Sequence, residues 1–181
     1  MKDMFSHLTK WKCRGDLNGI PKSIIVVAPH TSYWDAVIGK CFLIRLGVKY
    51  VFLSKKDLFR FPFGFFMKAF GAIPIGNNKG HNAINDIANM LQNTENLHVI
   101  ICPEGGFPAT KRWNPGFYYM ALKANVPIVV AYIDYGKKEV GIKGVITNLS
   151  DKRAVYKQLT QYYNGVTARH PENFELPQTD I

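Results

Sequence analysis

The feature that most constrains the fold of this chain is an uninterrupted apolar run, SIIVVA, at residues 23–28. A β-branched run with no polar alternation is typical of a strand buried on both faces, which occurs in parallel sheets covered by helices. Similar or shorter runs predict further strands at 48–53, 73–75, 97–102, 126–133 and 140–147. The chain is therefore expected to build a sheet whose central strands lie inside the molecule.

Helical patterns separate these strands, at about 32–46, 80–96 and 115–123 and from residue 150 onward. In the first of them, Val37, Cys41 and Ile44 share one stripe, and Gly47 ends the helix. Ser150 is the expected N-cap of the last helix. Strands that alternate with helices predict an α/β domain with a mostly parallel central sheet flanked by helices on both faces.

The length of 181 residues suits a single domain spanning 1–181, with a lead-in at 1–20 and a surface arm at 171–181. No apolar run approaches the ~18 to 20 residues that a membrane-spanning helix needs. The first residues do not resemble a secretory signal. Three cysteines, an odd number without metal-type spacing, indicate a reduced cytosolic setting and no metal site.

The net charge of +10 indicates a polyanionic partner. Nucleic acid, an anionic membrane surface, phosphorylated ligands and acidic carrier proteins all satisfy this condition, and charge alone does not choose among them. The basic residues are not gathered in a recognisable nucleic-acid motif, so a nucleic-acid partner is not expected.

The segment LFRFPFGFFMKAF, residues 58–70, is rich in phenylalanine. A helix from Pro62 would align four apolar side chains for the core: Phe63, Phe66, Met67 and Phe70. Phe59, Phe61 and Phe65 remain. They are interleaved with the basic residues Lys55, Lys56, Arg60 and Lys68, which is the pattern of a segment that rests at a membrane interface. The same residues could stack on single-stranded nucleic acid, but dense phenylalanines broken by Gly and Pro fit lipid better.

Two ionisable residues follow the first strand in the stretch APHTSYWD, residues 28–35. With Ser32 as N-cap, Asp35 occupies the third helical position and completes a capping box, which is the structural explanation. The same arrangement lets Asp35 face His30, where a carboxylate fixes the tautomer of an imidazole acting as general base. Both explanations stay open on spacing alone. Ser32 is not the expected nucleophile, because no Gly-x-Ser-x-Gly elbow surrounds it.

A second polar site follows the strand at 97–102, where ICPEGGFPAT breaks the apolar run. Glu104 followed by Gly105 and Gly106 indicates a carboxylate held near a backbone that approaches a ligand closely. A plain turn with a solvated glutamate is the alternative. In parallel α/β sheets chemistry gathers at the carboxyl ends of strands, and both His30 and Glu104 have that position.

Four segments resemble, in order and spacing, the motif blocks of the glycerolipid (lysophospholipid) acyltransferase family: PHTSYWD, GAIPI, CPEGG and VPIVVAY. The resemblance runs from about Ala28 to Tyr135. It implies an O-acyltransferase of phospholipid biosynthesis that moves a fatty acyl group from a thioester, on coenzyme A or acyl carrier protein, to a hydroxyl of a lysophospholipid such as 1-acylglycerol-3-phosphate. It also implies that His30 is the general base and Asp35 its partner, with no cofactor besides the acyl-donor substrate.

Eight residues are expected to contact substrate: Ser32, Asn77, Lys79, Glu104, Gly105, Gly106, Lys111 and Arg112. Asn77 and Phe107 stand where the family usually carries arginines associated with the acceptor's phosphate, and neither side chain forms the planar fork of a guanidinium. The nearby basic residues could supply charge from other positions. Otherwise the acceptor has no phosphate there, or the protein binds membrane lipid without catalysis.

The implied chemistry needs no covalent acyl-enzyme, and Cys102 is a minor alternative as a nucleophile, more simply explained as a small buried residue at a strand end. The positive charge would hold the enzyme on anionic lipid and attract an acidic carrier protein or the phosphates of coenzyme A. The sequence therefore predicts a cytoplasmic enzyme that is peripheral on the inner face of the membrane.

Overall fold

The computed structural model describes residues 10–60, 63–75 and 81–179. Its strands are β1 (Lys12–Arg14), β2 (Lys22–Ala28), β3 (Tyr50–Lys55), β4 (Ala72–Ile75), β5 (Leu97–Ile101), β6 (Ile128–Asp134) and β7 (Glu139–Ile146). Its α-helices are α2 (Tyr33–Leu46), α3 (Phe63–Ala69), α4 (His81–Gln92), α5 (Gly116–Ala124) and α6 (Lys152–Tyr163). Two short 3₁₀ helices, η1 (Lys56–Phe59) and η2 (Pro171–Asn173), complete the described elements.

The strands form one sheet in the order β1-β7-β6-β2-β5-β3-β4. The run from β6 to β4 is parallel throughout, whereas β7 pairs antiparallel with β6 and parallel with β1. The predicted α/β fold with a mostly parallel sheet is confirmed. β3 begins and ends two residues later than its apolar run indicated, which places Lys55 at its carboxyl end.

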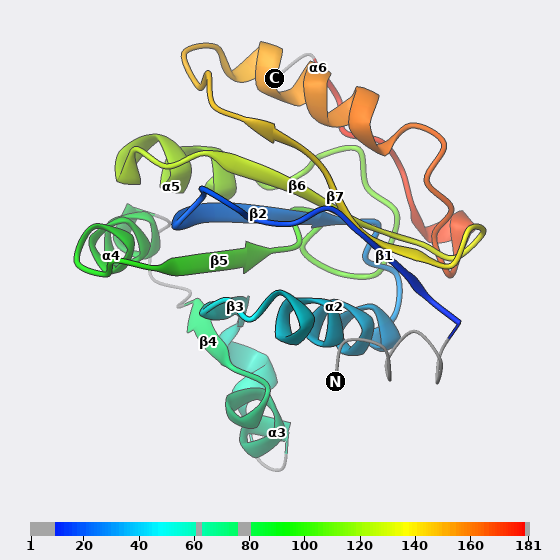
Figure 1. Cartoon of the computed structure of the whole chain (residues 1–181), viewed down its shortest axis with the longest axis horizontal. Helices are drawn as coiled ribbons and strands as arrows, with labels where there is room; N and C mark the ends of the chain where they lie inside the picture. Colours follow the sequence, from blue (N-terminus) through cyan, green and yellow to red (C-terminus); the bar gives the residue numbers. More distant parts are fainter. Residues whose placement is uncertain (1–9, 61–62, 76–80, 180–181) are drawn as a thin grey trace.

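Helices cover both faces of the sheet, with α2 on one face and α4, α5 and α6 on the other (Figure 1). β2 shows why its sequence lacks polar alternation. Ile24 and Val26 contribute to the core beneath α4, α5 and α6, while Ile25 contributes to the core beneath α2. Since successive side chains of a strand point to opposite faces, both sets must be apolar.

α2 begins and ends at the predicted signals, but the predicted apolar stripe is wrong. Ser32 is the N-cap and Gly47 the left-handed C-cap. Val37 and Ile44, placed on the stripe, are 41% and 57% exposed. The buried face instead carries Asp35, Ile38, Phe42 and Leu43. The helix is therefore rotated so that the face bearing Asp35, with apolar residues three and seven positions later, lies against the sheet.

The N-cap of α6 is Asp151, not the predicted Ser150. The Asp151 carboxylate accepts a hydrogen bond from the Arg153 N–H at 2.8 Å. Ser150 instead bonds the side chain of Asn148, at 2.7 Å. Both residue types cap helices well, so the choice between neighbours is made by the loop that precedes them.

The C-terminal segment packs along the domain. Phe174 and Leu176 contact the main core, the Trp113 indole N–H donates to the Glu175 carbonyl at 3.3 Å, and the Gln178 N–H donates to the Lys111 carbonyl at 2.9 Å. The segment expected to be a surface arm is thus held by both apolar and backbone contacts.

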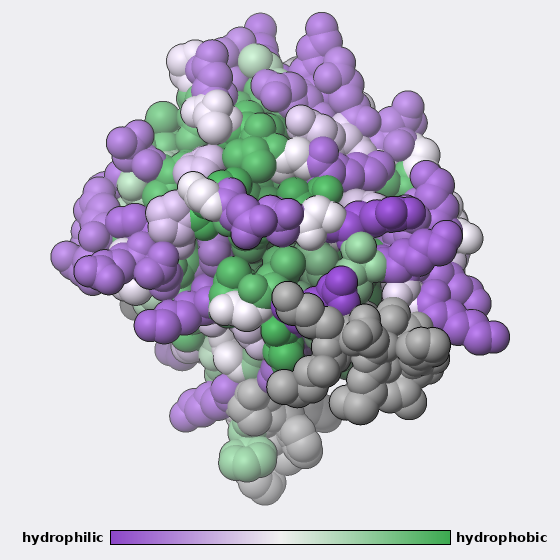
Figure 2. Space-filling model, in the orientation of Figure 1, coloured by the Kyte–Doolittle hydropathy of each residue, from purple (hydrophilic) through white to green (hydrophobic). Residues whose placement is uncertain are grey.

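Hydrophilic residues occupy much of the outline of the molecule, and hydrophobic ones lie nearer the middle of the face shown in Figure 2. Within the described ranges, none of the helices combines the length and the apolar character needed to cross a membrane.

Candidate active site

The site is built where the parallel strands end. His30 follows β2, Glu104 follows β5, Tyr135 follows β6 and Lys55 ends β3. These four strands are neighbours in the sheet, in the order β6-β2-β5-β3. Because the carboxyl ends of parallel strands meet at one edge, four segments distant in sequence deliver side chains to a single place.

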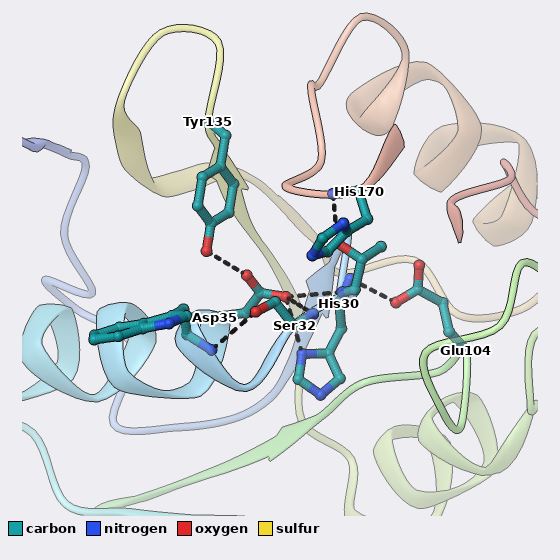
Figure 3. Close-up of polar contacts among 8 residues, drawn as sticks. His30, Ser32, Asp35, Glu104, Tyr135 and His170 are labelled. Carbon is teal, nitrogen blue, oxygen red and sulfur yellow. Dashed lines mark hydrogen bonds and ion pairs between the residues drawn. The ribbon is translucent and has the colours of Figure 1, made fainter. Parts of the chain in front are cut away.

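The structure brings His30 and Asp35 together. His30 Nδ1 lies 3.4 Å from Asp35 Oδ2, and the two side chains are 21% and 2% exposed (Figure 3). His30 precedes α2 and Asp35 lies in its first turn. The imidazole is thus open to solvent on one side while its partner is enclosed.

Asp35 is held at four points. Its Oδ2 accepts the backbone N–H groups of Thr31 and Ser32, each at 2.8 Å, in addition to facing His30. Its Oδ1 accepts the Tyr135 hydroxyl at 2.6 Å. Burial raises the pKa of Asp35, but hydrogen bonds from His30, Tyr135 and the Ser32 N–H outweigh it and hold the pKa below its ordinary value. The carboxylate is therefore charged at neutral pH, and it completes the capping box of α2 while it also faces His30.

Glu104 contacts the backbone of the candidate base. Its Oε2 accepts the His30 N–H at 2.7 Å. Its Oε1 is buried and finds no hydrogen-bond partner in the described part of the chain. Burial raises the pKa of Glu104 to about 8, with Asp35 adding to the rise and the His30 N–H opposing it. A carboxyl group with that pKa is mostly protonated at neutral pH, so the solvated turn considered from the sequence is wrong.

The glycine loop after Glu104 lies close to a lysine. Gly105 adopts φ +72, a conformation that favours glycine. A Cβ at Gly106 would lie 3.9 Å from Lys55 Nζ. Lys55 thus brings a positive charge to the loop, a role that sequence reasoning missed because it assigned this lysine only to the membrane-interface pattern.

Phe107 forms an aromatic wall beside the candidate base. Its ring centroid lies 5.1 Å from that of His30 and 4.7 Å from that of Tyr33, the latter edge to face. Tyr33 itself is 73% exposed. The imidazole therefore has an apolar surface immediately beside it.

Cys102 is unsuited to nucleophilic attack. Burial, reinforced by the negative charges of Glu104 and Asp35, raises the pKa of the Cys102 thiol far above its ordinary range. The thiolate is the nucleophilic form of cysteine, so the acyl-enzyme alternative loses its support.

The other residues expected to contact substrate are either exposed or outside the described part of the chain. Lys111 and Arg112 are exposed, and none of the described hydrogen bonds or ion pairs joins their side chains to His30. Asn77 and Lys79 lie outside the described residues. Among the phenylalanines expected at a membrane, Phe65 is 78% exposed and Phe59 half-buried, while Phe61 is outside the described residues.

Three neighbours of the site were missed from the sequence. Tyr135 contacts Asp35, and the Arg169 guanidinium carbon lies 5.9 Å from the Tyr135 ring and 5.7 Å from the Trp34 ring. The His170 N–H donates to the Thr31 hydroxyl at 3.2 Å, which closes the C-terminal segment over the turn (Figure 3). The position of Tyr135 directly after a buried strand is the signal that could have found it.

The family model described as Acyltransferase matches residues 11–134. The chain belongs to the acyltransferase family. Among solved structures, this acyltransferase is similar to the 1-acyl-sn-glycerophosphate (LPA) acyltransferase PlsC from Thermotoga maritima. The TM-score is 0.56 at 18% sequence identity, over 87% of this chain and 71% of that chain. At that identity the likeness shows a shared fold. A search of curated proteins finds no match.

The described residues of the acyltransferase contain no group of three or more His, Cys, Asp or Glu side chains that could hold a metal ion.

Proposed function

We propose that this acyltransferase moves a fatty acyl group from a thioester to a hydroxyl of a lysophospholipid, such as 1-acylglycerol-3-phosphate, with His30 as general base. The contact between His30 Nδ1 and Asp35 Oδ2 at 3.4 Å carries the proposal. Because Nδ1 faces a buried carboxylate, Nε2 is the ring nitrogen left to accept a proton from the acceptor.

His30 accepts a proton from the acceptor hydroxyl and later gives it to the leaving thiolate. Nε2 takes it from the hydroxyl as the oxygen attacks the thioester carbonyl, which is worth roughly 10²–10⁴ in rate. Asp35, charged because its pKa is low, stabilises the imidazolium. When the tetrahedral intermediate collapses, the C–S bond breaks and the imidazolium returns the proton to the leaving thiolate. The products are the acylated lipid and the free thiol of coenzyme A or acyl carrier protein.

The net charge and the exposed aromatic side chains support binding of the acyl donor and of the membrane. The net charge of +10 favours the phosphates of coenzyme A or an acidic carrier protein, and anionic lipid. Phe65, Tyr33 and Trp34 are 78%, 73% and 56% exposed, and aromatic side chains of this kind settle at a membrane interface. The proposal places the enzyme as a peripheral protein on the inner face of the cytoplasmic membrane.

Two observations bear on the acceptor and point in different directions. Lys55 beside Gly106 supports an acceptor with an anionic group next to the reacting hydroxyl. The Phe107 ring against His30 supports an apolar group there instead. The second candidate function is therefore the same acyl transfer to an acceptor without phosphate at that point.

A substrate panel tests these candidates. Purified enzyme is given acyl-CoA or acyl carrier protein with lysophosphatidic acid or with monoacylglycerol, and free thiol and lipid products are measured. If the acceptor carries a phosphate, Lys55→Gln should raise the KM for that acceptor, whereas Lys157→Gln, at an exposed lysine of α6, should not. Turnover confined to the neutral acceptor would favour the second candidate. No turnover with any acceptor, together with binding to anionic vesicles, would favour a non-catalytic lipid-binding protein.

A further inference from the structure

We propose that Tyr135 is a positioning residue of the acyl transfer, whose hydroxyl fixes the Asp35 carboxylate that orients His30. The inference rests on the proposed function, since it requires that His30 is the base. The proposal adds Tyr135, at the carboxyl end of β6, to the pair formed by His30 and Asp35.

The two oxygens of Asp35 divide their partners. Oδ2 serves His30 and the backbone N–H groups of Thr31 and Ser32. Oδ1 has the Tyr135 hydroxyl, at 2.6 Å. The Asp35 side chain is only 2% exposed, so water has little access to replace a missing donor. Without Tyr135, one oxygen of a buried charge would lose its bond, and the orientation of the carboxylate toward His30 would be less fixed.

Tyr135 is itself fixed by contacts that do not involve its hydroxyl. Its N–H donates to the Thr167 carbonyl at 2.9 Å. Its ring meets that of Trp11 edge to face at 5.0 Å. Removing only the oxygen should therefore leave the ring in place.

The hydroxyl also sets the charge that reaches the imidazole. A donor to Oδ1 draws negative charge from the carboxylate, which then holds the imidazolium less strongly. Burial and the Asp35 carboxylate raise the pKa of Tyr135 and outweigh the opposing hydrogen bond and charge of Arg169, so the phenol stays protonated and remains a donor. Among the described residues, the other titratable groups near this pair are Arg169, beside the Tyr135 ring, and Glu104, which follows β5 and is mostly protonated at neutral pH.

The test compares Tyr135→Phe with a matched variant, Tyr118→Phe. The Tyr118 hydroxyl donates a buried hydrogen bond to the Leu149 carbonyl at 2.8 Å, and Tyr118→Phe removes that bond. Tyr135→Phe should lower kcat roughly tenfold to hundredfold, the range for loss of a hydrogen bond to a charged group, with little change in KM. The acid limb of its kcat/KM profile should move to higher pH. Tyr118→Phe should change neither, and a structural role alone would not move the pH profile.

Two further variants locate the effect. In an Asp35→Ala background, Tyr135→Phe should have no additional effect on kcat, because Tyr135 acts through Asp35. 3-Fluorotyrosine at position 135, a stronger donor of the same shape, should move the acid limb the opposite way. Unchanged kcat and pH profile in Tyr135→Phe, with His30→Ala inactive, would overturn this inference alone. Full activity in His30→Ala would overturn the proposed function itself.

Discussion

The raised pKa of Glu104 makes the stability of the enzyme fall as the pH rises. The group has a pKa of about 8 in the folded protein, against 4.5 without burial. The folded state therefore binds a proton over a pH range in which the unfolded chain has released it. The stabilisation is complete below pH 4.5 and is lost as the pH rises through 8.

The magnitude follows from the same two pKa values. At 1.36 kcal/mol per pH unit, the rise from 4.5 to about 8 corresponds to about 5 kcal/mol lost across the whole interval. Between pH 5 and pH 7.5 the loss is about 3 kcal/mol. Glu104→Gln removes the titration while its amide oxygen can still accept the His30 N–H that Oε2 accepts in the native protein.

Urea unfolding of the wild type and Glu104→Gln at pH 5, 6, 7 and 7.5 measures the effect directly. The free energy of unfolding of Glu104→Gln, minus that of the wild type, should become more positive by about 3 kcal/mol over this range. All other titrating groups cancel in that difference. Glu95→Gln, at an exposed position, is the matched control for the change of a glutamate to a glutamine. A flat difference for Glu104→Gln would refute the reasoning.

Three further predictions concern stability, measured by urea unfolding. Asp35→Ala removes the acceptor of hydrogen bonds at 2.8, 2.8 and 2.6 Å and should cost roughly 3 kcal/mol; a cost below about 1 kcal/mol would contradict this. Burial lowers the pKa of His98 below 6.5. The contribution of neutral His98 to the free energy of unfolding is therefore complete above pH 6.5 and is lost as the pH falls. Ser23→Ala, which removes the 2.8 Å partner of His98 Nδ1, should cost about 1–3 kcal/mol at pH 7.5. In Gly39→Ala the added methyl group lies in open space beside α2, so the substitution should stabilise the protein by about 1 kcal/mol. In Gly141→Ala the methyl group would meet the backbone of β1, so the substitution should destabilise the protein. Equal effects of the two substitutions would contradict this packing.

Local signals predicted much of the site. Ser32 as N-cap, Asp35 three residues later and Gly47 at the end define α2 by short-range chemistry, and the same signals allow the contact with His30. The rotation of the helix was predicted wrongly because apolar residues occupy nearly all of its faces. In the observed rotation, Asp35 is buried and its side chain contacts Tyr135, a hundred residues later in the chain. Local sequence patterns do not show such a distant contact.

The remaining parts of the site depend on which strands become neighbours. The carboxyl-end rule singled out His30 and Glu104 because charged residues after buried strands are conspicuous. Tyr135 has the same position after β6 but also suits an ordinary core, so its residue type gave no warning. Lys55 reaches the glycine loop because β3 pairs with β5, a pairing that no local pattern in the sequence encodes.

The central claim is that His30 is the base in acyl transfer to a hydroxyl. The most direct measurement is kcat with the best donor and acceptor of the substrate panel, for the wild type, His30→Ala and Cys102→Ala, each shown to be folded by circular dichroism. His30→Ala should lower kcat by roughly 10²–10⁴ with little change in KM, and Cys102→Ala should retain the wild-type value. A folded His30→Ala enzyme that transfers acyl groups at the wild-type rate would contradict the account.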